Sequence, residues 1–255
     1  MRSLQRGLDI LQIVNQHNGL TVSEVAQRAG VPRPTAYRLL ETLEGLGYVA
    51  RDASSDGWRP TLQTKSLSSG FRDEDWVASI AVPMMIRLGR RLLWPLDLVT
   101  FRDYRMAVRA STHNMSPFSV DKGMVGRELP ILETAGGRAH LAFVPPAEGE
   151  AVLTGLRGRY GSENVDFQDD GPLERILERT RELGLGYRIR GSVNRKTMSL
   201  SAPVLLCERP VACLTIIWIA SALKFEDALS EFRAPLLATA RAMSEEMARA
   251  TPQEL

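Results

Sequence analysis

Apolar and polar positions along the first 50 residues follow the period of short amphipathic helices. Apolar side chains recur every three or four positions, which predicts a first helix. They are Leu4, Leu8, Leu11 and Val14. A second helix is expected after Thr21, because Glu24 three residues later completes the pattern of a capping box. Gly30 is expected to end this second helix in a tight turn.

A third helix is expected to open at Pro32 and Pro34, since proline is tolerated in a first turn, where its missing N–H has no partner. Its apolar positions are Tyr37, Leu39, Leu40, Leu43 and Leu46. Two short helices joined by a glycine turn predict a helix-turn-helix. Residues 47–51 and 58–59 predict two strands around a turn at 54–57, so a hairpin wing would complete a winged helix-turn-helix.

Side chains at the start of the third helix are the candidates for contact with DNA. In this docking mode the first turns of the recognition helix reach base edges in the major groove. The candidate DNA-binding residues are Arg33, Pro34, Thr35, Tyr37, Arg38 and, on the wing, Arg59. Arginine can contact guanine or phosphate, and hydroxyl groups can bond phosphate oxygens. The alternative is an exposed three-helix bundle whose arginines are only solvated.

Further helices are expected in the rest of the chain. Residues 76–93 have helical spacing, and Pro83 is expected to kink or restart that helix. Residues 131–143 predict a helix capped near Thr134, and residues 172–183 predict another. The C-terminal helix is indicated by an apolar stripe of Phe225, Leu229, Phe232, Leu236, Met243 and Met247.

Strands are expected between these helices. Residues 97–102 and 106–110 predict a hairpin, while residues 198–206 and 210–219 are rich in the apolar side chains of buried strands. The strands and helices do not alternate regularly. The pattern therefore predicts an α+β fold with an antiparallel sheet rather than a parallel doubly wound sheet.

Composition and charge narrow the class of protein. A chain of 255 residues with 44% hydrophobic residues suits two globular domains. Residues 1–72 hold nine Lys and Arg against six Asp and Glu, a balance of +3, and the remainder holds 23 against 24, a balance of −1. No apolar window is long enough for a membrane span. The N-terminus resembles mature protein rather than a signal peptide, so a cytoplasmic location is expected.

Catalytic and metal chemistry find little support in the sequence. The chain has two cysteines and three widely spaced histidines, and it lacks a nucleophile elbow and a P-loop. The glycines at 155, 158 and 161 predict a flexible basic loop, and Cys207 is expected to be a small buried residue. The acidic pairs at 169–170 and 226–227 are expected to cap helices. We therefore expect no enzyme, no metal and no cofactor.

Several sequence runs resemble the IclR family of bacterial transcriptional regulators. They occur in the order and spacing of that family and cover nearly the whole chain. They are residues 6–11, 34–40, 42–49, 125–130, 134–139 and 201–204. Within the family, residues 67–76 and 93–97 look most like members that activate the catabolism of 3-(3-hydroxyphenyl)propionate.

The resemblance implies a three-part architecture. It consists of a winged helix-turn-helix domain over residues 1–68, a linker helix region over 69–93, and an effector-binding and oligomerisation domain over 94–255. The last would have a GAF/PAS-like mixed α/β fold. The implied partners are double-stranded operator DNA, a second copy in a homodimer or dimer of dimers, and RNA polymerase as a further candidate.

The resemblance also implies an effector site at the start of the helix that begins near Thr134. Backbone N–H groups there would hold a carboxylate, aided by the partial positive charge of a helix N-terminus. Family members that bind very small oxo acids carry an acid at the position of Ile189 or Arg190 and a cysteine at Ser199. Both are missing here, which favours a larger aromatic acid. The candidate effector residues are Met124, Leu129, Thr134, Ala135, Gly136, Arg190, Met198, Ser199, Thr215, Ile217 and Trp218.

Other polar residues have two readings. Arg109, Arg138 or Arg190 could bind the effector carboxylate, although each could equally be a solvated surface arginine. His113 could bond a ring hydroxyl or lie at the surface in a loop. The resulting hypothesis is a regulator that senses a hydroxybenzoate or hydroxyphenylpropionate to control aromatic catabolism genes. The alternatives are a repressor that senses a small non-aromatic organic acid, a ligand-binding protein without operator recognition, and an enzyme on the α+β domain.

Overall fold

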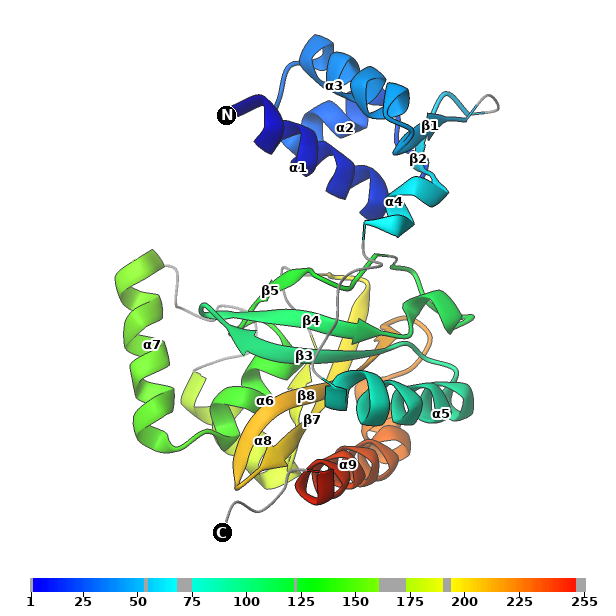
Figure 1. The fold of residues 1–255 in the computed structure, drawn as a ribbon. Coiled ribbons are helices and arrows are strands. Elements are labelled where there is room, and N and C mark those ends of the chain that lie inside the picture. Colours follow the sequence, from blue (N-terminus) through cyan, green and yellow to red (C-terminus); the bar gives the residue numbers. More distant parts are fainter. Residues whose placement is uncertain are drawn as a thin grey trace. The chain divides into compact units, whose positions relative to one another are not determined.

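The computed structural model describes residues 2–52, 55–67, 75–121, 123–160, 173–189 and 194–250. The chain divides into two compact units, Met1–Arg72 and Asp73–Leu255 (Figure 1). The predicted boundary at residue 68 and most of the predicted start of the linker lie outside the described residues. The α+β class and the N-terminal helix-turn-helix are confirmed.

The first unit is a winged helix-turn-helix. Its elements are α1 (Arg2–Gln16), α2 (Val22–Ala29), α3 (Arg33–Gly45), β1 (Val49–Arg51), β2 (Trp58–Pro60) and α4 (Leu62–Ser66). The two strands pair antiparallel, with Val49 opposite Pro60. The predicted wing is therefore present as a short hairpin that follows the recognition helix.

The predicted capping box sets the start of α2. The Thr21 N–H donates to Glu24 Oε2 at 2.8 Å, and the Glu24 N–H donates to Thr21 Oγ1 at 3.4 Å. The Thr21 N–H and, next, the Thr21 hydroxyl both donate to the Glu24 carboxylate and lower its pKa, because they favour its charged form. At the other end Gly30 adopts a φ of 62°, the left-handed conformation that glycine tolerates best.

The core of this unit draws only on the C-terminal half of α1. Ile10, Leu11 and Val14 are buried against α2, α3 and Trp58. Leu4 and Leu8, which belong to the same predicted stripe, are 69% and 54% exposed. The helix is present as predicted, and the first two turns of its apolar stripe stay exposed, because nothing in the described part of this unit covers them.

The second unit is built on one antiparallel sheet. Its order is β5-β4-β3-β8-β7-β6. The strands are β3 (Leu96–Arg102), β4 (Arg105–Ser111), β5 (Glu128–Pro130), β6 (Gly186–Arg188), β7 (Thr197–Leu206) and β8 (Arg209–Ile219). The predicted β3–β4 hairpin and the two later strands are confirmed by the register of their residues.

The β3–β4 and β7–β8 hairpins each close through two residues with positive φ. Asp103 and Tyr104 join β3 to β4, and Cys207 and Glu208 join β7 to β8. Such turns match the twist of paired strands. Cys207 is exposed in its turn, so the expectation of a buried residue is wrong, whereas Cys213 is buried. Burial raises the pKa of the Cys213 thiol to about 12.

Helices cover the two faces of the sheet differently (Figure 1). One face packs against α5 (Val82–Leu92) and α9 (Phe225–Ala250). The other carries α6 (Ala135–Phe143), to which α7 (Pro146–Tyr160) and α8 (Leu173–Leu183) add apolar side chains. Each face has its own apolar cluster, so the sheet separates two cores.

Pro83 restarts the helix that precedes the sheet. A π-helix spans Val77–Ala81, and the Val82 N–H donates to the Val77 carbonyl five residues earlier. Pro83 then lies in the first turn of α5, where it needs no N–H partner. The wider π turn accommodates the proline without ending the helical path.

The glycine run at 155–161 and the two acidic pairs lie only partly within the described residues. Gly155 and Gly158 lie within α7, which corrects the predicted flexible loop, and Gly161 lies outside the described residues. A Cβ at Gly155 would meet the Tyr104 ring at 2.4 Å, so close packing explains this glycine. Glu226 and Asp227 lie in the first turn of α9, and the pair at 169–170 is not described. No described helix has the length and apolar character needed to cross a membrane.

Candidate DNA-binding and effector sites

The predicted recognition helix exposes the residues expected to meet DNA. Ala36 and Leu40 of α3 are buried in the core, which fixes the orientation of the helix. The side chains of Pro34, Tyr37 and Arg38 are exposed, Arg33 is exposed at the first position of the helix, and Thr35 is half-buried. The predicted contact residues on this helix, apart from half-buried Thr35, are thus accessible. Whether they touch DNA stays a prediction.

Tyr37 has an acidic partner on its own helix. Its hydroxyl is hydrogen-bonded to Glu41, and this bond together with the nearby negative charge raises the pKa of Tyr37. The two residues stand four apart and therefore share one helix face. A phosphate that bonds the Tyr37 hydroxyl would have to compete with the Glu41 carboxylate.

The wing arginines are also paired with carboxylates. Arg59 on β2 lies 3.5 Å from Asp52, and Arg51 on β1 hydrogen-bonds Asp56. All of these groups are at least partly exposed, so the pairs are weak and exchangeable. Arg51 was not among the sequence candidates, although its place on the same hairpin as Arg59 was readable from the predicted wing.

The predicted effector helix is capped as the sequence indicates. Thr134 precedes α6, and its Oγ1 accepts the Gly137 N–H at 3.1 Å and donates to the Pro130 carbonyl at 3.0 Å. The Arg138 N–H donates to the Thr134 carbonyl. The N–H groups of Ala135 and Gly136 are the remaining first-turn donors that a carboxylate could meet.

Two glycines bring α6 directly onto the sheet. A Cβ at Gly136 would lie 2.6 Å from Val99 Cγ2 and 3.4 Å from Thr215 Oγ1. A Cβ at Gly186 on β6 would lie 2.1 Å from the Ala135 carbonyl oxygen. These glycines therefore serve helix–sheet packing, in addition to any approach of a ligand to the backbone.

A row of polar side chains lies on the face of the sheet that packs against α6. Ser199, Thr215 and Ile217 occupy this face, and Ser199 pairs in register with Ile217. Ser201 lies beside Thr215, with 2.8 Å between their hydroxyl oxygens. Ser201 was not predicted as a site residue, yet its spacing of two from Ser199 on one strand could have identified it.

Asp97 and His113 extend this row to the next strand. Asp97 on β3 is opposite Thr215 in register, and both Asp97 and His113 are buried. His113 Nε2 lies 3.6 Å from Asp97 Oδ2, and His113 Nδ1 lies 2.6 Å from Ser119 Oγ. Within the described part of the chain, Asp97 Oδ1 and His113 Nε2 have no hydrogen-bond partner.

This arrangement corrects one expectation and adds one residue. The preferred reading of His113 as a surface loop histidine is wrong, because its ring is almost fully buried. Asp97 was missed by the sequence reasoning. The available signal was a lone carboxylate within the apolar run from Leu96 to Val99.

Two predicted effector residues lie on the wrong face of the sheet. Trp218 and Met198 are opposite each other in register and point toward α9. The Trp218 indole N–H donates to the Leu223 carbonyl at 3.0 Å, and its ring packs on Phe232. The expectation that both residues line one site with Thr134 is corrected, because neighbouring residues of a strand point to opposite faces.

The other predicted residues have separate outcomes. Met124 and Leu129 pack at the border of the α6-side core. Arg138 is buried and donates to the carbonyls of Leu132 and Tyr187, so it is neither solvated nor aimed at a ligand carboxylate. Arg190 lies outside the described residues, and Arg109 faces the α5 and α9 side.

A helix-turn-helix with a wing and exposed arginines, joined to a separate α+β unit, defines a DNA-binding regulator with its own sensor domain. Comparison with known families agrees. The model described as IclR helix-turn-helix domain matches residues 3–53, and that described as bacterial transcriptional regulator IclR C-terminal matches residues 73–245. The chain belongs to the IclR family of transcriptional regulators and is not an enzyme.

Curated relatives are regulators of several kinds. The HTH-type transcriptional regulator KdgR of Escherichia coli is 26% identical over 187 residues, which are 72% of this chain and 69% of that protein. The acetate operon repressor of Salmonella typhimurium is 30% identical over 189 residues, 73% of this chain and 69% of that protein.

Solved structures show the same fold. The IclR protein of Thermotoga maritima aligns with a TM-score of 0.65 at 21% identity and covers 97% of this chain and 99% of its own. An IclR homolog of Microbacterium hydrocarbonoxydans, solved in complex with 4-hydroxybenzoate, aligns with a TM-score of 0.60 at 18% identity, covering 98% and 100%.

Proposed function

We propose that this regulator binds palindromic operator DNA as a dimer or dimer of dimers and responds to a small hydroxylated aromatic carboxylate. The observation that carries the effector class is the buried pair of atoms Asp97 Oδ1 and His113 Nε2 beside Thr215, which lack hydrogen-bond partners among the described residues. Buried polar atoms of this kind normally have a partner, and a ligand hydroxyl would supply one. Its action would be cytoplasmic, on genes of aromatic catabolism.

The two ends of such a ligand would be recognised by different elements. The N–H groups of Ala135 and Gly136 would bind the carboxylate at the start of α6. The ring hydroxyl would donate to Asp97 or accept from His113, one strand across from Thr215. Apolar contact with the ring would come from Ile217, Leu129 and Met124. The 4-hydroxybenzoate complex of the Microbacterium homolog supports this class of ligand.

A small non-aromatic acid is the second candidate. The first turn of α6 is buried, and Gly136 is held tightly between Val99 and Thr215, which favours a compact ligand. The hydroxyl groups of Ser199, Ser201 and Thr215 could also meet a polar ligand. One relative is named the acetate operon repressor, after the operon of a small non-aromatic acid.

Calorimetric titration of the full-length protein separates the two candidates. The probes are 4-hydroxybenzoate, benzoate, 3-(3-hydroxyphenyl)propionate, pyruvate and glyoxylate. The hydroxylated aromatic acids are expected to bind tightest. Asp97→Asn is expected to weaken the binding of the hydroxylated acids about tenfold. It is expected to change the affinity for benzoate little, because benzoate has no ring hydroxyl that could bond Asp97.

Asp227→Asn in the exposed first turn of α9 is the matched control and is expected to bind every acid as the natural protein does. Tighter binding of pyruvate or glyoxylate than of any aromatic acid would favour the second candidate. Equal losses for benzoate and 4-hydroxybenzoate in Asp97→Asn would exclude the proposed hydroxyl contact.

The DNA-binding half is tested by mobility shift with the promoter of the adjacent genes. Arg38→Ala is expected to weaken the complex by about tenfold or more, because an arginine contact with a base or phosphate is lost. Arg249→Ala, an exposed arginine of α9, is the control. Unchanged DNA affinity in Arg38→Ala removes this residue from the contact set, and no shift with the natural protein supports a ligand-binding protein without operator recognition.

A further inference from the structure

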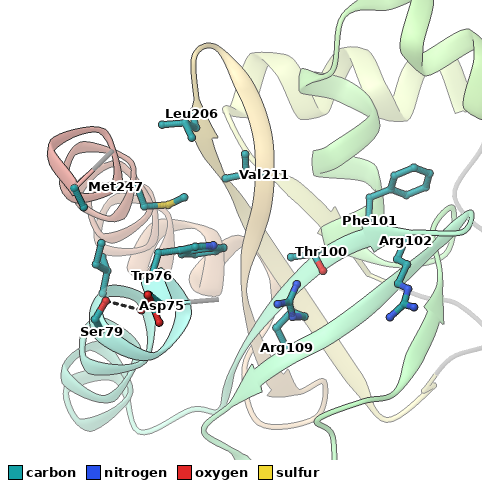
Figure 2. A pocket seen from close by; sticks show the side chains of 12 residues that line it. Asp75, Trp76, Ser79, Thr100, Phe101, Arg102, Arg109, Leu206, Val211 and Met247 are labelled. Atoms are coloured by element: carbon teal, nitrogen blue, oxygen red, sulfur yellow. Dashed lines mark hydrogen bonds between the residues drawn. The ribbon is translucent and has the colours of Figure 1, made fainter. Parts of the chain in front are cut away.

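A cavity lies on the opposite face of the sheet from the proposed effector site. Its volume is about 680 Å³, which falls within the usual range for small-molecule pockets. Figure 2 shows its lining, in which Arg109 and Thr100 from the sheet lie across from Trp76. All residues of the lining belong to the second unit.

The cavity forms where two central strands part. The register pairs between β3 and β8 end at Val99 opposite Cys213. Beyond that point the β3–β4 hairpin and the β7–β8 hairpin diverge, as Figure 2 shows. Thr100 then lies on one side of the gap and Val211 on the other. The opening is therefore a feature of the sheet rather than of a surface loop.

Two β-bulges aim side chains into this cavity. In the β3–β4 register Leu98 pairs with Ala110 and Val99 with Val108, which leaves Arg109 as the extra residue. In the β7–β8 register Val204 pairs with Ala212 and Leu205 with Pro210, which leaves Val211. Both extra residues line the cavity. Bulges redirect side chains and are common beside binding sites.

The lining combines a cationic side with an apolar side. Arg109 supplies a guanidinium group and Thr100, which is 8% exposed, supplies a hydroxyl. Arg102 adds a second, largely exposed guanidinium, and Asp75 is the carboxylate among the described residues of this lining. Because a guanidinium has five N–H donors, Arg109 can keep a bond within the protein and still bind an anion.

The apolar side consists of Trp76, Ile80, Val211 and Met247, among others. An indole face and aliphatic side chains suit a flat or branched hydrocarbon body. We propose that this cavity binds a small organic carboxylate with an aromatic or apolar body, its carboxylate on Arg109 and Thr100 and its body against Trp76.

The position of Trp76 in the chain would connect ligand binding in the cavity to the segment that leads to the DNA-binding unit. Trp76 stands directly before the π-helix Val77–Ala81, close to the boundary between the two units at residue 72. A ligand held between Trp76 and the sheet would stabilise the start of this helix. Such a ligand would bias the segment that leads to the DNA-binding unit, provided that it binds one arrangement of that segment better than another.

Tryptophan fluorescence of the full-length protein tests the proposal. The signal of Trp76 is taken as the difference between the natural protein and Trp76→Phe, during titration with benzoate and with 3-phenylpropionate. Benzamide is the neutral control. At least one acid is expected to change the Trp76 signal in a saturable way, and benzamide is not. Arg109→Met is expected to weaken this binding about tenfold or more, since a charge-assisted contact is lost.

Arg209→Met is the matched control, because Arg209 is an exposed arginine of β8 that is not part of the cavity lining and pairs with Glu148. It is expected to bind within about twofold of the natural protein. With 4-hydroxybenzoate as the probe, Asp97→Asn is expected to leave the Trp76 signal unchanged. This separates the cavity from the proposed effector site, where the same variant is expected to weaken the binding of 4-hydroxybenzoate.

Several outcomes would overturn the proposal. They are no Trp76-specific change at millimolar acid, an equal response to benzamide, and unchanged affinity in Arg109→Met. If Arg109→Met fails to fold, as judged by its circular dichroism and melting temperature, Val211→Phe replaces it. The larger side chain would fill the cavity, and retained acid binding in that variant would equally refute the site.

Discussion

The two faces of the six-stranded sheet in the second unit are built from the same strands. Along β7 and β8, one face carries apolar side chains and the other carries hydroxyl groups. Toward α5 and α9, β7 and β8 present only apolar groups at Leu200, Ala202, Val204, Leu214, Ile216 and Trp218. Toward α6 the same strands present Ser199, Ser201 and Thr215. Residues of a strand alternate between the faces of a sheet, so one segment of sequence can build a core and a polar site together.

The two faces also differ in how they could admit a ligand. The α6 face holds buried polar atoms without partners among the described residues, at Asp97 and His113. The other face is covered by α5 and α9, and a cavity among the described residues opens beside Arg109, where β3 and β8 part. Stability and recognition should therefore respond differently to changes on each face.

The largest effect is expected from the apolar face. Trp218→Ala should lower the free energy of unfolding by about 3 to 5 kcal/mol, because the indole is 1% exposed and its loss leaves a cavity. Urea unfolding followed by circular dichroism measures this change. Trp94→Ala, at a half-buried position, should cost clearly less. Equal losses of unfolding free energy in the two variants would show that side chains on the α9 side of the sheet are packed no more closely than half-buried ones.

His140 tests the α6 side by its pH dependence. Burial lowers the pKa of His140 to about 4, and its ring stacks on Phe101 at 4.8 Å. The folded state therefore disfavours the charged ring. Stability is highest above about pH 6.5, where the ring is neutral in both the folded and the unfolded chain. It falls as the pH drops toward 4, because the unfolded chain takes up a proton that the folded protein does not. The loss should be of the order of 2 to 3 kcal/mol.

Melting temperatures between pH 7 and pH 4 measure this effect, with His140→Leu as the variant. The variant should lose part of the pH dependence that the natural protein shows. His17→Asn, in the first unit, should keep it. An unchanged pH profile in His140→Leu would assign the dependence to other groups.

A pair of glycine variants tests how closely α6 approaches the sheet. Gly136→Ala should cost about 1 to 3 kcal/mol, because its Cβ would lie 2.6 Å from Val99 Cγ2. Gly158→Ala in α7 meets nothing within 4 Å and should stabilise the protein by up to about 1 kcal/mol. Urea unfolding gives both values, and stabilisation by Gly136→Ala would contradict the packing described for α6.

The smallest effects are expected from removing a single hydroxyl group on the α6 face and from adding one on the opposite face. Ser201→Ala should cost about 1 kcal/mol, since it removes the bond with Thr215. Ala202→Ser should cost at least as much, because its hydroxyl would enter the apolar core. Urea unfolding of both variants measures the two costs. If neither variant changed the free energy of unfolding, the proposed difference in polarity between the two faces would be wrong.

Local patterns predicted most of the fold. The capping box at Thr21, the cap at Thr134, the β3–β4 hairpin and the restart of the helix at Pro83 depend on residues close together in the chain. The short strands β5 and β6 were not predicted, because three residues carry too little periodicity. Their places are set by pairing with β4 and β7.

The candidate site was predicted less completely. Gly136 packs against Thr215, and Ser199 lies on the same face of the sheet, whereas Trp218 and Met198 lie on the other face. Strand alternation alone could have separated these two from Ser199 and Thr215, because residues an odd number apart on one strand point to opposite faces. The burial of Arg138 and His113 was not readable, because it depends on groups up to 49 residues away.

The sequence alone determined the family, the helix-turn-helix and the order of the elements, since these depend on neighbouring residues. The tertiary structure decided which residues face each other across that order. It placed Asp97 beside Thr215 and left Leu4 exposed. It also made Arg109 and Val211 the extra residues of two bulges. Register, burial and divergence of strands arise from long-range pairing, and no local pattern specifies them.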